Sequence, residues 1–125
     1  MNHDPIPVLA LHGVGMCPEL FEPTIAALSG VPCLAPRRLG YRDDVRPRSL
    51  DDMVDDVVAM IERHGPLVVV GVSGGATLAM AAALRAPNGL RGVVAHEPLV
   101  GPLVPQLHSV VAASAGLLAA DPEPA

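Results

Sequence analysis

The sequence predicts an α/β fold, with a mostly parallel sheet of about four strands and helices on both of its faces. Short apolar runs, of the kind buried on both faces of a parallel sheet, alternate along the chain with segments of helical spacing. The chain has 125 residues and 50% of them are apolar, which suits one domain with a single core. No internal repeat or low-complexity linker divides it.

The first half of the chain begins with a strand. Pro7–Leu11 is a continuous apolar run that is predicted to be buried in the sheet. A helix is expected from about Pro18 to Leu28. Val31–Ala35 predicts a weaker strand, because Pro32 has no N–H to donate to a strand ladder. Arg37–Arg48 is polar and broken by proline and glycine, which predicts a loop.

The next helix has the clearest start and stop signals in the chain. Ser49 can cap its N-terminus, and Asp52 lies three residues further on, a weak form of the capping box. Gly65 and Pro66 end it. Residues spaced by three and four form one apolar face: Leu50, Met53, Val54, Val57, Val58 and Ile61. An amphipathic helix packed on the sheet is therefore expected.

The remaining segments repeat the pattern of strand and helix. Leu67–Val70 predicts a buried strand, Gly71–Gly75 a tight turn and Ala76–Arg85 a helix. Leu90–Ala95 predicts another apolar strand. The apolar segment Leu99–Ala120 predicts one loose helix, followed by a frayed end.

Charge and cysteine content argue against several classes of protein. Acidic residues outnumber basic ones by 13 to 8, and every basic residue is arginine. No basic stripe interleaved with aromatic side chains is present, so no nucleic-acid partner is expected. Cys17 and Cys33 form neither a CxxC pair nor a disulfide framework, which predicts reduced thiols in a cytoplasmic protein. Met1–Pro5 lacks the basic and apolar regions of a signal peptide.

One uncharged stretch is long enough to suggest a membrane span. Leu67–Leu84 contains no charged residue. However, it begins with β-branched residues, is interrupted by glycines and ends in a run rich in alanine. A buried strand, a tight turn and a buried helix explain that order better, so no membrane partner is expected.

The turn between the expected strand 67–70 and its helix has the pattern G-x-S-x-G, from Gly71 to Gly75. A nucleophile on so sharp a turn needs strained backbone angles and small neighbours, which explains glycines two residues on either side of Ser73. The turn would lift the Ser73 hydroxyl above the sheet edge and aim the N–H of Gly74 at a developing oxyanion. The structural alternative is a glycine-rich turn that only permits close helix–strand packing. Nucleotide binding is disfavoured, because neither G-x-G-x-x-G spacing nor a lysine after the glycines is present.

A second glycine-containing loop, His12-Gly13-Val14-Gly15, follows the first expected strand. Such a loop can turn a backbone N–H, that of Val14, toward the same oxygen. Two backbone donors of this kind, from Val14 and Gly74, would form an oxyanion hole. His12 itself is expected to bond its own loop rather than to transfer protons.

These segments together resemble the α/β-hydrolase fold family, and they stand in the order that the family has. Pro7–Gly15 resembles its third strand and oxyanion loop. Ala35–Arg42 resembles a degraded form of the D-x-R-G-x-G-x-S loop that follows its fourth strand. Val68–Ala86 is similar to its fifth strand, nucleophile elbow and following helix, and Gly92–Pro98 to its sixth strand.

The resemblance covers roughly the first 100 residues and implies a truncated α/β-hydrolase core. Residues 1–101 would form that core, and residues 102–125 the start of a lid or cap segment with a frayed tail. In this fold the chain order reverses between the strand before the oxyanion loop and the elbow strand, here Pro7–Leu11 and Leu67–Val70. Open α/β sheets bind ligands at such a switch point, beyond the carboxyl ends of the strands.

The resemblance also shows what the site lacks. A serine hydroxyl needs a base, normally a histidine oriented by a carboxylate. In this family that histidine follows the eighth strand, whereas the segments of this chain end with the sixth, so the chain is expected to be incomplete as an enzyme. His64 would interact with the end of its helix, and His96 lies beside a strand end. His108, in the expected lid, is the one histidine that could fold over Ser73.

The acid of the site is also open. Glu97 follows the sixth strand of the family pattern, where some members carry their catalytic carboxylate. The alternative for Glu97 is an acceptor that orders the oxyanion loop or lid.

The sequence therefore predicts a serine hydrolase that acts on an ester, thioester or related acyl group of a small molecule, with no metal or other cofactor. Two alternatives stay open: a non-catalytic module that binds a small molecule, and another reaction on the same scaffold, such as a cofactor-independent haloperoxidase or acyltransferase. Leu90–Ala95 would form an exposed apolar edge. Self-association through that strand, or its burial by the tail Leu103–Ala120, is expected.

Overall fold

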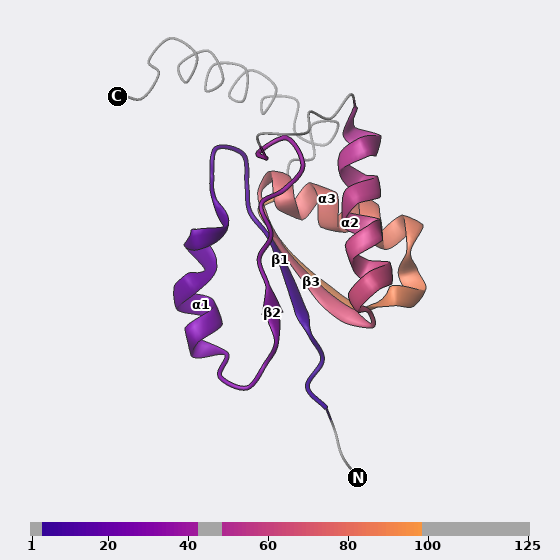
Figure 1. Ribbon diagram of the computed structural model, residues 1–125. Coiled ribbons are helices and arrows are strands. Elements are labelled where there is room, and N and C mark those ends of the chain that lie inside the picture. Colours follow the sequence, from indigo (N-terminus) through magenta and orange to yellow (C-terminus); the bar gives the residue numbers. More distant parts are fainter. Residues whose placement is uncertain (1–3, 43–48, 99–125) are drawn as a thin grey trace, which may run out of the picture.

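The computed structural model describes residues 4–42 and 49–98, which form a parallel sheet with helices on both faces (Figure 1). The strands are β1 (Val8–Leu11), β2 (Cys33–Leu34), β3 (Leu67–Val72) and β4 (Leu90–His96), in the order β2-β1-β3-β4. All three pairings are parallel, so the expected fold class is confirmed. The expected tail helix and the division of the chain after residue 101 lie outside the described residues.

Strands β1 and β3 are the two inner strands of the sheet, and their carboxyl ends lie close together. Val8 pairs with Cys33 on one side and with Val68 on the other, and Leu11 pairs with Gly71. Strand β2 thus lies on one side of β1 and strand β3 on the other, as the resemblance implied. The loops that follow β1 and β3 therefore leave the sheet at a topological switch point, where ligands bind in open α/β sheets.

One face of the sheet is covered by the two longest helices, α2 (Leu50–His64) and α3 (Gly74–Arg85) (Figure 1). Alternate residues of β1 and β3 point to this side, and Leu11 and Val69 are fully buried there together with Ile61 of α2. Each such aliphatic side chain contributes about 2 kcal/mol through its burial. The core lies between this face and the two helices.

The other face of the sheet carries a shorter 3₁₀ turn, η1 (Pro18–Phe21), followed by α1 (Glu22–Ala27) (Figure 1). Val8 and Val70, which alternate with the core residues of their strands, line a space of about 250 Å³ together with Ile25 of α1. Helices are therefore present on both faces, but α1 covers its face less completely than α2 and α3 cover theirs.

Helix α2 begins and ends where the sequence predicts. The Ser49 hydroxyl oxygen accepts a hydrogen bond from the Asp52 N–H at 3.2 Å, which caps the N-terminus. At the other end, the Gly65 N–H donates to the Ile61 carbonyl at 2.7 Å. An ion pair between Asp55 of α2 and Arg85 of α3 joins the outer surfaces of the two helices.

Several expected elements differ in extent from the structure, and two of the larger differences arise from proline. The helix expected over residues 18–28 is divided into η1 and α1, because Pro23 has no N–H to continue a helical ladder from η1. The strand expected over residues 31–35 is reduced to Cys33–Leu34, although the Pro32 carbonyl still accepts from the Val8 N–H at 2.8 Å. The turn expected over residues 71–75 is reduced to Ser73, because β3 continues through Val72 and α3 begins at Gly74.

Among the helices in the described ranges, none combines the length and the apolar character needed to cross a bilayer. The uncharged stretch 67–84 consists instead of β3 and most of α3.

Candidate functional site

Ser73 stands alone between β3 and α3. The strand ends at Val72, the helix begins at Gly74, and the Ser73 backbone has φ 55° and ψ −116°. Such a positive φ is unfavourable for a residue with a Cβ atom. Two hydrogen bonds hold it in place: the Ser73 N–H donates to the His96 carbonyl at 2.8 Å, and the Thr77 N–H donates to the Ser73 carbonyl at 3.1 Å. The sharp strand-to-helix turn predicted from the G-x-S-x-G pattern is present.

The glycines two residues before and after Ser73 are required by close backbone contacts. A Cβ atom at Gly71 would lie 2.6 Å from the backbone of Ala76, and one at Gly75 would lie 2.6 Å from the His12 carbonyl oxygen. Backbone atoms at these places cannot move aside without distorting α3 or the end of β1. The first turn of α3 therefore packs directly on the ends of β1 and β3, and the close packing considered as a structural alternative occurs together with the strained serine.

The loop that follows β1 lies against this turn. A Cβ atom at Gly13 would lie 3.2 Å from the Ser73 Cβ, and one at Gly74 would lie 3.7 Å from the Val14 nitrogen. The Val14 N–H makes no hydrogen bond within the described ranges. The N–H of Gly74, the first residue of α3, has no partner inside its helix. A positive φ of 71° at Gly15 lets the loop turn back. Two backbone donors thus lie beside Ser73, a pattern that suits a negatively charged oxygen.

His12 fixes this loop and is not available for proton transfer. Its side chain is 0% exposed, Nδ1 lies 3.0 Å from the Gly13 carbonyl oxygen, and Nε2 accepts from the Arg38 N–H at 3.1 Å. Because Nε2 accepts, the ring proton is on Nδ1, which donates to Gly13. Burial lowers the pKa of His12. The hydrogen bond to the Gly13 carbonyl opposes this shift, and the charges of Arg38 and Arg37 reinforce it. The ring is therefore neutral, and the expectation that it bonds its own loop is confirmed.

Tyr41 supports the same loop from the other side. Its hydroxyl oxygen accepts from the Gly15 N–H at 3.2 Å, and its ring meets that of His12 edge to face, with centroids 4.8 Å apart. The segment after β2 thus contacts both the first and the last residue of the His12–Gly15 loop. These contacts hold the Val14 N–H in place relative to Ser73.

The residues considered as acid and base are not assembled around Ser73 in the part of the chain that is described. Glu97 directly follows His96, whose carbonyl holds the Ser73 N–H, so the Glu97 backbone adjoins the turn. Its side chain is exposed, and it makes no hydrogen bond or ion pair with any residue in the described ranges. His64 is the last residue of α2, as expected, and His108 lies outside the described residues.

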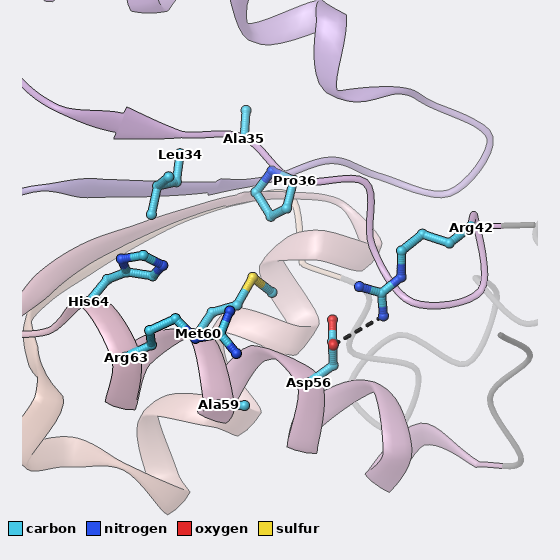
Figure 2. A pocket seen from close by; sticks show the side chains of 9 residues that line it. All are labelled: Leu34, Ala35, Pro36, Arg42, Asp56, Ala59, Met60, Arg63 and His64. Carbon is cyan, nitrogen blue, oxygen red and sulfur yellow. Dashed lines mark hydrogen bonds and ion pairs between the residues drawn. The ribbon is translucent and has the colours of Figure 1, made fainter. Parts of the chain in front are cut away.

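A larger pocket, of about 450 Å³, lies away from this turn (Figure 2). Figure 2 shows Arg42 and Asp56 facing each other at one end, joined by an ion pair at 3.1 Å, and His64 beside Leu34 at the other end. Neither Ser73 nor the His12–Gly15 loop lines this pocket. The larger pocket is therefore separate from the candidate site.

A smaller cavity adjoins the two backbone donors and includes two side chains that sequence reasoning did not identify. Arg38 and Tyr41, from the segment after β2, line a space of about 240 Å³ together with Val14 and Gly74. The position of these two residues after a strand, at the ligand-binding edge of an α/β sheet, is the signal that could have identified them. The described ranges contain no group of three or more His, Cys, Asp or Glu residues placed to hold a metal ion.

A comparison with curated proteins finds no match to this chain. Solved structures do match it. The meta-cleavage product hydrolase of Pseudomonas fluorescens is 28% identical with a TM-score of 0.67, over 76% of this chain and 39% of that protein. The epoxide hydrolase of Vigna radiata is 28% identical with a TM-score of 0.63, over 74% of this chain and 33% of that protein. The N-formylmaleamic acid deformylase of Pseudomonas putida is 25% identical with a TM-score of 0.67, over 79% of this chain and 42% of that protein.

The chain therefore spans between 33% and 42% of the length of these three enzymes. A sequence model of the alpha/beta hydrolase family matches residues 8–125, which is nearly the whole chain. The sheet order, the strained serine after β3 and the loop after β1 all lie within the matched residues. The chain belongs to the alpha/beta hydrolase family.

Proposed function

We propose that this chain carries the nucleophile and the oxyanion hole of a serine hydrolase that acts on an ester, thioester or related acyl group of a small molecule. The observation that carries the proposal is the backbone of Ser73, held at φ 55° between β3 and α3 beside the Val14 and Gly74 N–H groups. Strain of this kind persists only where surrounding contacts impose it, and it concentrates at functional sites.

In the proposed reaction, the Ser73 Oγ attacks the acyl carbonyl carbon and its proton passes to a base. The negative charge that develops on the carbonyl oxygen is stabilised by the N–H groups of Val14 and Gly74 and by the N-terminus of α3. Collapse of this intermediate expels the alcohol or thiol, which takes the proton back from the base. Water then hydrolyses the acyl-serine to the carboxylic acid and free Ser73. Each backbone donor contributes about 3 kcal/mol of transition-state stabilisation in sites of this type.

The base is the part of the proposal that the described residues do not supply. Both ring nitrogens of His12 are engaged in the loop, so a second histidine is needed, from elsewhere in this polypeptide or from another one. Glu97, next to the elbow and exposed, is proposed as a carboxylate that could orient that histidine. This division of roles predicts that Ser73 is reactive only when a base is provided.

The proposal is tested by covalent labelling of the purified chain with a fluorophosphonate, read out by intact mass and peptide mapping. Imidazole in the buffer serves as a diffusible substitute for the base. We expect labelling of Ser73 that rises with imidazole concentration and is lost in Ser73→Ala. Ser29→Ala makes the same chemical change at an exposed loop residue and should label as the wild type does.

The alternatives give different results in the same experiment. Labelling that survives Ser73→Ala, or no labelling at any imidazole concentration, contradicts the serine hydrolase proposal. A non-catalytic binding module would bind short esters without any covalent product at Ser73. A haloperoxidase or acyltransferase activity would share the acyl-serine step, and product analysis with added halide and peroxide, or with an added alcohol, separates these reactions from hydrolysis.

A further inference from the structure

The loop after β2 places an arginine where no residue of the described ranges 4–42 and 49–98 provides a counter-ion for its charge. Arg38 is only 2% exposed, and its Nε and Nη2 atoms have no hydrogen-bond partner. The three ion pairs found within residues 4–42 and 49–98 involve other arginines: Arg37, Arg42 and Arg85. Counted along the D-x-R-G-x-G-x-S pattern, Arg38 stands at the first glycine, so a large cation replaces the smallest residue of that loop.

An unpaired cation in this position is unfavourable unless something binds it. A guanidinium stays protonated at neutral pH, and buried charges in proteins are almost always paired, because their lost hydration is otherwise not replaced. Desolvation lowers the pKa of Arg38, and the neighbouring Tyr41 side chain opposes that shift. The Tyr41 ring, whose centroid is 5.0 Å from the guanidinium carbon, covers one part of the charge, but Nε and Nη2 still have no hydrogen-bond partner.

The unpartnered edge of the guanidinium is buried next to the proposed oxyanion hole. Arg38 Nη2 lies 3.4 Å from where a Cβ atom at Gly74 would be, and Arg38 lines the 240 Å³ cavity together with Val14 and Gly74. The rest of that cavity is largely apolar, with Met53 and Leu78 among its walls. At about 30 Å³ per water in the liquid, the cavity has room for roughly eight non-hydrogen atoms. It therefore suits a short chain with an anionic end.

We propose that this cavity binds the carboxylate of a short acyl substrate, so that the preferred substrates are monoesters of small dicarboxylic acids. Nε and Nη2 form one edge of the guanidinium, and their two parallel N–H groups match the two oxygens of a carboxylate. The ester carbonyl of the same molecule would then lie toward Val14, Gly74 and Ser73. This inference rests on the proposed function because it names a substrate. Binding of a carboxylate to the site can nevertheless be measured without turnover.

The test compares two small esters of nearly equal shape, one anionic and one neutral. Monomethyl succinate carries a carboxylate where methyl levulinate carries a methyl ketone. Binding of each to the Ser73→Ala chain, which cannot be acylated there, is followed by NMR titration at low salt. We expect monomethyl succinate to bind roughly 10- to 100-fold more tightly, the effect of hydrogen bonds to a buried charge. Equal affinities for the two esters would overturn the inference.

Matched variants assign the effect to Arg38. Arg38→Met, in the same Ser73→Ala background, is expected to bring the affinity ratio close to one. Arg38→Lys should retain only part of it, because an ammonium has no two-pronged edge. Arg37→Met is the control, since Arg37 is exposed and paired with Glu19 at 3.3 Å, and it should leave the ratio unchanged. A ratio that is unchanged in Arg38→Met, or lost in Arg37→Met, overturns the assignment.

The melting temperature without ligand provides an independent readout. Removing an unpaired buried charge should leave it unchanged or raise it in Arg38→Met. A fall of several degrees would mean that the protein itself already stabilises the Arg38 charge, and would overturn the inference. Labelling of Ser73 without a preference for monomethyl succinate contradicts this inference alone. A preference that depends on Arg38, without labelling, supports the carboxylate site and contradicts the proposed function alone.

Discussion

Replacing Ser73 by glycine is expected to make the chain more stable, although it removes the proposed nucleophile. The Ser73 backbone has φ 55° and ψ −116°, a conformation that costs a residue with a Cβ atom about 1–3 kcal/mol. Glycine adopts it with little strain, but its greater freedom in the unfolded chain costs roughly 0.5–1 kcal/mol. The difference leaves a net gain of about 1 kcal/mol in the free energy of unfolding for Ser73→Gly.

The comparison with alanine isolates backbone strain from the loss of the hydroxyl. Ser73→Ala keeps the Cβ atom, and the Ser73 side chain makes no capping hydrogen bond to α3, so its stability should stay close to that of the wild type. Urea denaturation followed by circular dichroism measures all three proteins. With a slope of about 2 kcal/mol per molar urea, the gain in Ser73→Gly corresponds to a midpoint roughly 0.5 M higher.

Ser49 provides the control, because it caps α2 in the usual way. Its backbone is extended and its hydroxyl oxygen accepts from the Asp52 N–H. Ser49→Gly should lower stability by a few tenths of a kcal/mol and Ser49→Ala by about 1 kcal/mol. If Ser73→Gly were also less stable than the wild type, the claim that contacts around Ser73 impose strain would be refuted.

Three further predictions follow from the described contacts. Gly75→Ala should lower the free energy of unfolding by about 3 kcal/mol in urea, because its Cβ would meet backbone oxygens at the end of β1, whereas Gly92→Ala, with nothing within 4 Å, should change it little. Burial lowers the pKa of His12 from 6.5, so as the pH falls His12 is protonated more readily in the unfolded chain than in the folded one. The urea midpoint should therefore fall as the pH drops below 6.5, and His12→Gln should weaken this pH dependence. Val94, which is 55% exposed on β4, is expected to promote self-association of the chain. Light scattering should find a larger fraction of monomer for Val94→Arg than for the wild type, but not for the control Leu84→Arg, and a wild type that is monomeric at all concentrations would refute this.

The parts of the fold that local sequence determines were predictable. The runs at β1 and β3 consist of apolar residues and glycine, and the run at β4 is apolar apart from Arg91 and its last residue, His96. Helix α2 has both a capping serine and an apolar face with a helical period. The turn at Ser73 was predictable because Gly71 and Gly75 are needed wherever a helix begins directly against a sheet. In each case the signal lies within a few consecutive residues.

The rest depends on contacts between segments far apart in the chain. The hydrogen bond from Arg38 to His12 and that from Gly15 to Tyr41 each join residues 26 positions apart, and no local pattern encodes such a pairing. The unpaired guanidinium of Arg38 is visible only after the chain has folded around it. The extent of η1 and α1 was also missed, because the effect of Pro23 on an apolar helical pattern depends on where the first turn begins.

The hydrogen bond from the Ser73 N–H to the His96 carbonyl links the strained serine to the outermost strand on its side of the described sheet. Strands at a margin open more readily than central ones, and each opening of β4 would release the constraint on that nitrogen. The persistence of the strained Ser73 conformation therefore depends in part on what lies against the far side of β4. A molecule that docks there would influence the Ser73 turn through the β3–β4 pairing and the Ser73–His96 hydrogen bond, without contacting Ser73 itself.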